Sequence, residues 1–133
     1  MPTQNMQLIL QGILAVTNNT IQNAPQISTF DFQNPTLGAN SLFFDPFFQA
    51  PTTSASVPLP ATVCYCAIIQ NNSASTILGV VFTPVGFSST EVRIGPGGIC
   101  IPVFDPLETG DGINFLELIG IGGTAVASVL VAA

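Results

Sequence analysis

Short runs of alternating hydrophobic and polar residues fill the second half of the chain. Residues 62–70 are rich in β-branched, aromatic and cysteine side chains, residues 71–75 form a polar break, and residues 76–83 resume the first pattern. Runs of this kind, separated by turn residues, are typical of β-strands. The two runs are predicted to pair as a β-hairpin.

A further strand is predicted over residues 90–94, where the alternation is strict. Val92 and Ile94 fall on one side of the strand, and Glu91 and Arg93 fall on the other. One apolar and one charged side indicate a strand that is buried on one face and solvated on the other.

The glycine-rich residues 95–98 follow as a tight connection, and residues 99–104 are predicted to run back and close a second hairpin. Two more strands are predicted over residues 113–119 and 124–131. Short strands at this spacing, with no helical pattern between them, indicate an all-β fold. We expect an antiparallel β-sandwich, jelly-roll-like or immunoglobulin-like.

Residues 1–60 differ from the rest of the chain, because prolines interrupt them repeatedly. They are predicted to form an irregular N-terminal arm that is rich in proline and phenylalanine, and residues 61–133 are predicted to form the β-sandwich domain. The regular element expected in the arm is a short helix over residues 6–16, where apolar side chains recur at helical spacing.

Four phenylalanines surround an Asp-Pro turn in the arm: Phe43, Phe44, Phe47 and Phe48. Together these rings carry too much apolar area to be left in water. Two interpretations remain open at this point. The rings either plug one end of the chain's own core or anchor the arm in a neighbouring subunit, which makes them candidate assembly contacts.

Charge is scarce along the chain. Only 6% of the residues are charged while 47% are hydrophobic, the formal net charge is −6, and Arg93 is the only basic residue. Binding to nucleic acid or to an anionic membrane needs clustered Lys or Arg, so neither partner is expected. Because charged side chains are depleted in interface cores, their scarcity predicts a surface that is largely buried in contacts, as in a homo-oligomer.

The three cysteines, Cys64, Cys66 and Cys100, have no histidine to complete a metal site. Zinc generally takes four ligands, with at least two residues between paired cysteines. Buried free thiols, which behave as small hydrophobic side chains, are the preferred interpretation. A disulfide from Cys100 stays open, since it depends on the separation of the Cα atoms.

Three acidic residues, Asp105, Glu108 and Asp111, surround a Thr-Gly dipeptide. They could present oxygen ligands to a calcium ion, but Asp and Gly also suit a solvated turn, which we prefer. Without a nearby His, Lys or positioned nucleophile they do not resemble a general acid and base. We therefore expect no catalytic residue, no metal and no cofactor, in a protein that is not an enzyme.

Three stretches carry a family resemblance: residues 67–74 (AIIQNNSA), 92–98 (VRIGPGG) and 123–133 (GTAVASVLVAA). They resemble small virion proteins of tailed bacteriophages, in the class of capsid decoration, cement or minor structural subunits. The resemblance implies a β-sandwich or jelly-roll fold and a location in the virion. It also implies a homo-oligomer, with a trimer favoured, that binds the major capsid protein or other virion subunits.

Two other hypotheses fit parts of the same pattern. In the first, the chain is an extracellular filament or pilus-like subunit whose arm completes the next subunit's sheet by strand addition. In the second, it is a small β-fold hydrolase or sugar-binding module. The second has little support, because Trp is absent and Tyr65 is the only tyrosine that could stack on a sugar.

Overall fold

The computed structural model describes residues 6–14, 28–39, 42–102, 104 and 112–133, and these residues form β-strands and no helix. The predicted all-β fold class is therefore confirmed. The strands are β1 (Met6–Leu14), β2 (Ser28–Ala39), β3 (Leu42–Ala50), β4 (Ala55–Ser56), β5 (Cys66–Asn71), β6 (Ile77–Pro84), β7 (Thr90–Ile94), β8 (Ile99–Cys100), β9 (Ile113–Ile121) and β10 (Ala125–Ala132).

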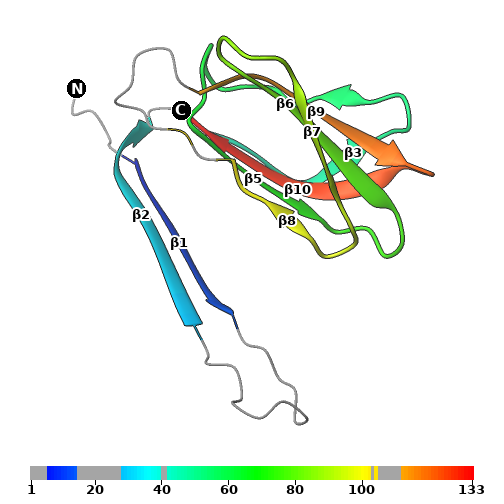
Figure 1. Ribbon diagram of the computed structural model, residues 1–133, viewed down its shortest axis with the longest axis horizontal. Helices are drawn as coiled ribbons and strands as arrows, with labels where there is room; N and C mark the ends of the chain where they lie inside the picture. The colour runs from blue at the N-terminus through cyan, green and yellow to red at the C-terminus, as the bar shows by residue number, and fades with distance from the viewer. Residues whose placement is uncertain (1–5, 15–27, 40–41, 103, 105–111) are drawn as a thin grey trace.

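The helix predicted over residues 6–16 is wrong. Those residues contain strand β1, which pairs antiparallel with β2 in a two-stranded sheet of its own (Figure 1). The arm thus contains a regular pair of strands where irregular structure was expected. A segment this short is marginal as an isolated helix in water, whereas a second extended segment offers it hydrogen-bond partners along its length.

The other strands form two antiparallel sheets of four strands each. The first sheet has the order β3–β10–β5–β8, and the second has the order β4–β9–β6–β7. Within them β3 pairs with β10, β4 with β9, β5 with β8 and β6 with β7. Strands β3 to β6 therefore pair with β7 to β10 in reverse order. The paired strands resemble one long two-stranded ribbon that is folded into two layers, which is the jelly-roll arrangement.

Both predicted hairpins are wrong, although the strands themselves are present. Strand β5 lies in the first sheet and β6 in the second, and β7 and β8 are divided between the sheets in the same way. In the sandwich, β6 and β7 are the consecutive strands that pair with each other. Local alternation marks a strand, but the sheet it joins depends on partners that are distant in the sequence.

The sandwich begins at Leu42, inside the segment that the sequence pattern assigned to the arm. Strand β3 forms one edge of the first sheet, and the short strand β4 forms one edge of the second. The partner of β3 is the C-terminal strand β10. Because β3 and β10 are far apart in the sequence, the local pattern near residue 42 does not predict their pairing.

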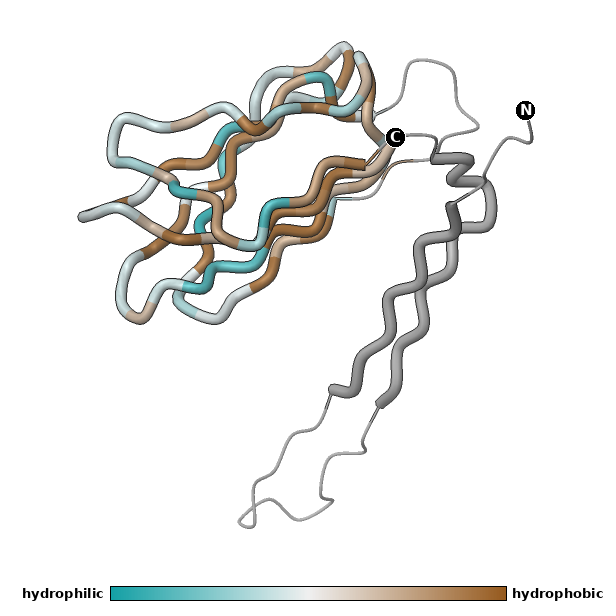
Figure 2. Tube along the Cα trace, turned by 180° about the vertical axis from the view of Figure 1, so that it is seen from behind, coloured by the Kyte–Doolittle hydropathy of each residue, from teal (hydrophilic) through white to brown (hydrophobic). Residues whose placement is uncertain are grey.

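The core lies between the two sheets and is almost free of polar groups. Its fully buried side chains come from both layers, among them Ile69, Val129 and Val131 of the first sheet and Leu78 and Leu118 of the second. In Figure 2 the most hydrophobic stretches of the tube follow the strands of the sandwich, and several of its turns are hydrophilic. The core is thus the dry interior expected of two packed sheets.

One buried polar residue, Asn71, ties the two layers together at one end. Its Nδ2 donates to the carbonyl oxygens of Thr76 (2.8 Å) and Ile94 (3.0 Å), and its Oδ1 accepts from the backbone N–H of Ser73 (3.0 Å). Asn71 closes β5 in the first sheet, whereas Ile94 closes β7 in the second. Its amide therefore stabilises the crossing between the sheets that the hairpin prediction missed.

Candidate interaction surface

The outer face of the first sheet is mainly apolar and carries no charge among its described residues. Register and alternation place six hydrophobic side chains on it: Leu42, Phe44, Phe47, Ile68, Ile99 and Leu130. We call this surface the uncharged face. Asp45, the one charged residue on the strands of this sheet, is paired with the buried Val129 and so belongs to the inner side of β3.

A β-bulge in β3 divides the four phenylalanines between the core and the surface. Two residues three apart lie on opposite faces of a regular strand, yet Phe44 and Phe47 are both outside, 58% and 74% exposed. Phe43 and Phe48 instead pack against the core. The register shift of β3 against β10, between Ala127 and Val129, supplies the extra residue that makes this division possible.

The structure thus decides the interpretation for half of the phenylalanines and leaves it open for the other half. Phe43 and Phe48 are part of the chain's own core. Phe44 and Phe47 are the members of the set that are available for contact with another molecule. The Asp-Pro dipeptide is no turn but the site of the bulge, where Asp45 Oδ1 accepts a hydrogen bond of 2.9 Å from the backbone N–H of Phe47.

The outward side chains form rows across the strands. Leu130 of β10 stands in register with Phe44 on one side and with Ile68 on the other. Beside this row, Gln70 stands between Ser128 and Ile99. Cross-strand neighbours on one face are close enough to pack together, so the uncharged face is a continuous surface across all four strands.

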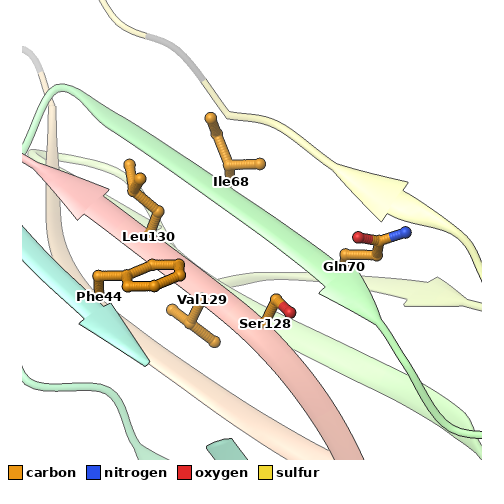
Figure 3. A pocket seen from close by; sticks show the side chains of 6 residues that line it. All are labelled: Phe44, Ile68, Gln70, Ser128, Val129 and Leu130. Atoms are coloured by element: carbon orange, nitrogen blue, oxygen red, sulfur yellow. The ribbon is translucent and has the colours of Figure 1, made fainter. Parts of the chain in front are cut away.

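A shallow hollow of about 140 Å³ lies in the middle of this face, lined by Phe44, Ile68, Gln70, Ser128, Val129 and Leu130. Figure 3 shows the ring of Phe44 and the branched side chains of Leu130 and Ile68 around it, with Gln70 and Ser128 toward one end. The lining comes from three neighbouring strands, β3, β10 and β5. Its walls are mainly apolar.

The hydroxyl of Ser128, at the edge of the hollow, is already hydrogen-bonded within the chain. It donates to the carbonyl oxygen of Pro46 (3.3 Å) and accepts from Asn72 Nδ2 (2.5 Å). Its hydrogen-bonding capacity is thus largely used. The hollow therefore suits an apolar occupant better than a polar one.

The outer face of the second sheet has a different character, and we call it the charged face. Register places Glu91, Arg93 and Glu117 on it, opposite Val81 and Gly79. Arg93 Nε donates to Glu91 Oε1 at 3.1 Å, with both side chains well exposed. An exposed pair of this kind contributes little to stability, and its main effect is to keep this face in water.

All three cysteines are free thiols, and no two of them are bonded. Cys64 and Cys66 are buried, as predicted, whereas Cys100 is partly exposed. Burial raises the pKa of the Cys66 thiol to about 11, and burial likewise raises the pKa values of Cys64 and Cys100. Thiols held in the neutral form are poor nucleophiles, so their environment suits packing and not reaction.

The predicted acidic loop of Asp105, Glu108 and Asp111 lies outside the described residues. Among the residues that are described, no three His, Cys, Asp or Glu side chains gather in a way that could hold a metal ion. The same part of the chain contains no helix long and apolar enough to cross a membrane.

Sequence reasoning found the phenylalanines of this surface but missed its other half. Ile68, Leu130 and Ile99 come from strands far along the chain, and alternation alone marks them as outward without showing that they meet Phe44. The chain matches no protein-family model, no curated protein and no solved structure. The geometry of the site is therefore the basis for any statement about function.

Proposed function

We propose that this chain is a structural virion protein, a capsid decoration, cement or minor capsid subunit that acts by self-assembly and by binding a shell. The observation that carries the proposal is the uncharged face. It exposes Phe44 and Phe47 on a protein of which only 6% of the residues are charged, and exposed apolar patches of this kind mark contact surfaces.

The size of the patch is sufficient for such a role. A phenylalanine presents roughly 200 Å², so the exposed fractions of Phe44 and Phe47 correspond to roughly 260 Å² of ring surface per copy. Burial of that area contributes about 6 kcal/mol at 25 cal/mol per Å². Association itself costs on the order of 4–15 kcal/mol, so the rings supply a large share of what a stable contact needs.

The jelly-roll arrangement is compatible with this role, since viral capsid proteins and lectins both use it. Fold alone does not decide between them. A lectin needs aromatic platforms on which sugars stack, and this chain has no Trp and only one Tyr. The composition therefore favours the capsid class over the lectin class.

The edges of the sandwich disfavour the alternative of a filament built by strand addition. Strands β4 and β8, at two of the edges, are only two residues long each. Strand β3 carries Pro46 and the bulge, and the edge strand β7 carries Glu91 and Arg93. Short strands, proline, bulges and charges are the devices that protect sheet edges from pairing, so contact through a face is the better proposal.

The arm is proposed to grip neighbouring subunits and not to complete the sandwich. All eight sandwich strands, four in each sheet, lie beyond residue 41. We therefore expect a variant that lacks residues 1–40 to unfold within a few degrees of the full chain but to occupy shells more weakly. Thermal unfolding and shell occupancy measure the two effects, and a variant that does not fold contradicts the division.

The proposed location is tested by immunogold electron microscopy of particles from the native source, with antibodies raised against the chain. Label on closed shells is expected, and label on open filaments overturns the proposal.

Assembly through an uncharged face should also survive about 1 M salt, where the Debye length is about 3 Å. Release of monomers in high salt would show that the contact is electrostatic.

A further inference from the structure

The uncharged face carries both a projecting ring and a hollow. Phe47, at the bulge, is 74% exposed and is the most exposed large hydrophobic residue of the described chain. The hollow lies close by, because Ser128, which lines it, is hydrogen-bonded to Pro46, the residue before Phe47. The projecting Phe47 ring, which we call the knob, and the hollow therefore lie side by side on one surface.

The hollow has the size of a phenyl ring. An enclosed apolar cavity of about 150 Å³, lined by Leu, Ile and Phe, binds benzene. The hollow has a similar volume of about 140 Å³ but is open to solvent on its outer side, with Phe44, Ile68 and Leu130 as its main walls. Among the described residues, Phe44 is the one phenylalanine that lines it. Phe44 forms one wall, and Phe43 and Phe48 pack toward the core.

We propose that the hollow takes the Phe47 ring of a second copy of this chain, and that the second copy's hollow takes this Phe47 in return. The inference rests on the proposed function only in its self-assembly. Knob and hollow lie on the same sheet face, so a two-fold axis in the plane of the contact, midway between them, brings each ring to the other copy's recess. Such a contact is isologous and closes at two copies.

The area of the face fits a weak, reversible pair. Its strands β3, β10, β5 and β8 contain nine, eight, six and two residues, so with a rise of about 3.3 Å per residue and a strand spacing of about 4.8 Å the face covers roughly 400 Å² per copy. The pair then buries roughly 800 Å², the size of a weak, transient contact.

Charge also favours contact through this face. Of the charged side chains that the structure describes, Glu91, Arg93 and Glu117 lie on the other layer of the sandwich, and Asp45 lies on the inner side of β3. Pairing through the uncharged face therefore leaves the whole thickness of both sandwiches between the two charged faces. Exposed charges separated by more than about 10 Å are largely screened at ordinary ionic strength.

The test compares two matched variants of the full chain, Phe47→Ser and Phe87→Ser. Phe87 is 72% exposed, nearly as much as Phe47, but it lies after β6, away from the hollow. Phe47→Ser is expected to weaken pairing at least 100-fold in sedimentation equilibrium while the melting temperature stays within a few degrees. Phe87→Ser is expected to leave pairing unchanged.

A mixing experiment tests the reciprocal geometry. Gln70→Trp fills the hollow but keeps the knob, and Phe47→Ser keeps the hollow but lacks the knob. Each variant alone loses both ring contacts, whereas a mixed pair regains one of them. Native mass spectrometry of the mixture is therefore expected to show more of the mixed pair than of either homodimer.

Several results would overturn the inference: Phe47→Ser retains the wild-type mass, Phe87→Ser dissociates as strongly, or the mixture shows no excess of the mixed pair. A wild-type chain that is monomeric at every concentration but still binds shells also overturns it, while leaving the proposed function intact. Conversely, if the pairing experiments give the expected results but the antibody labels open filaments, the proposed function is wrong and the inference about pairing stands.

Discussion

The two outer faces of the sandwich have similar strands beneath them but meet their surroundings differently. On the charged face, Ile119 covers Gly79, with its Cγ2 atom only 2.5 Å from the position that a Cβ of Gly79 would occupy. The most exposed large hydrophobic residues of that face, Ile77 and Phe115, are 41% and 39% exposed beside the charges. On the uncharged face, Phe44 and Phe47 stand out into solvent, 58% and 74% exposed. Hydrophobicity alone thus does not identify a contact surface. What does so is apolar area that the chain leaves uncovered and unaccompanied by charge.

The largest effect on stability is expected from a substitution of Asn71, which joins the two layers. Asn71→Ala removes two hydrogen bonds to carbonyl oxygens and one from a backbone N–H, and leaves those buried groups without partners. We expect the free energy of unfolding to fall by about 3–5 kcal/mol. Urea denaturation measures the change. Asn72→Ala, at an exposed neighbour, is the control and should cost about 1 kcal/mol.

Raising the pH deprotonates the buried Cys66 thiol and so places a negative charge in the first sheet. The pKa of the buried Cys66 thiol rises from 9.0 to about 11 on folding. The folded state therefore keeps a proton that the unfolded chain loses, so stability is unaffected below pH 9 and falls between about pH 9 and 11. The loss should reach about 2–3 kcal/mol.

Denaturation midpoints measured across this pH range test the effect of the Cys66 thiol, and Cys66→Ala provides the comparison. The substitution is expected to flatten the decline, leaving the smaller contributions of Cys64 and Cys100, whose pKa values are also raised by burial. An equally steep decline in Cys66→Ala would show that another group is responsible.

Two phenylalanines of strand β3 test the division between the core and the uncharged face. Phe48 packs against the core, so Phe48→Ala should cost about 2 kcal/mol, less than a fully buried ring because Phe48 is only partly covered. Phe44→Ala, on the uncharged face, should change stability by less than about 0.5 kcal/mol but weaken pairing. Chemical denaturation and sedimentation measure the two effects, and equal losses of stability would contradict the assignment of faces.

The smallest effect is expected on the charged face. Arg93→Gln removes an exposed pair with Glu91, and exposed pairs are worth about 0–1 kcal/mol. We expect a change of less than about 0.5 kcal/mol in stability and none in the mass of the assembly. Light scattering that shows a smaller assembly would mean that the charged face also makes contacts.

The sequence by itself determined four of the eight sandwich strands, β6, β7, β9 and β10. Residues 90–94 were predicted as a strand and form β7, and the strands predicted over residues 76–83, 113–119 and 124–131 match β6, β9 and β10 within two residues at each end. Local alternation sufficed for these elements, because a strand with one buried side must repeat every second residue. Burial of Cys64 and Cys66 also followed from residue type alone.

Tertiary structure decided which sheet each strand joins and which phenylalanines face outward. β5 and β6 resemble a hairpin in sequence but lie in different layers, since pairing depends on β10 and β9, which come much later in the chain. The split of the phenylalanines depends on a bulge that exists only because β3 is paired with β10. The hollow follows from the same pairings, because its walls on β3, β5 and β10 meet only when the ribbon has folded over.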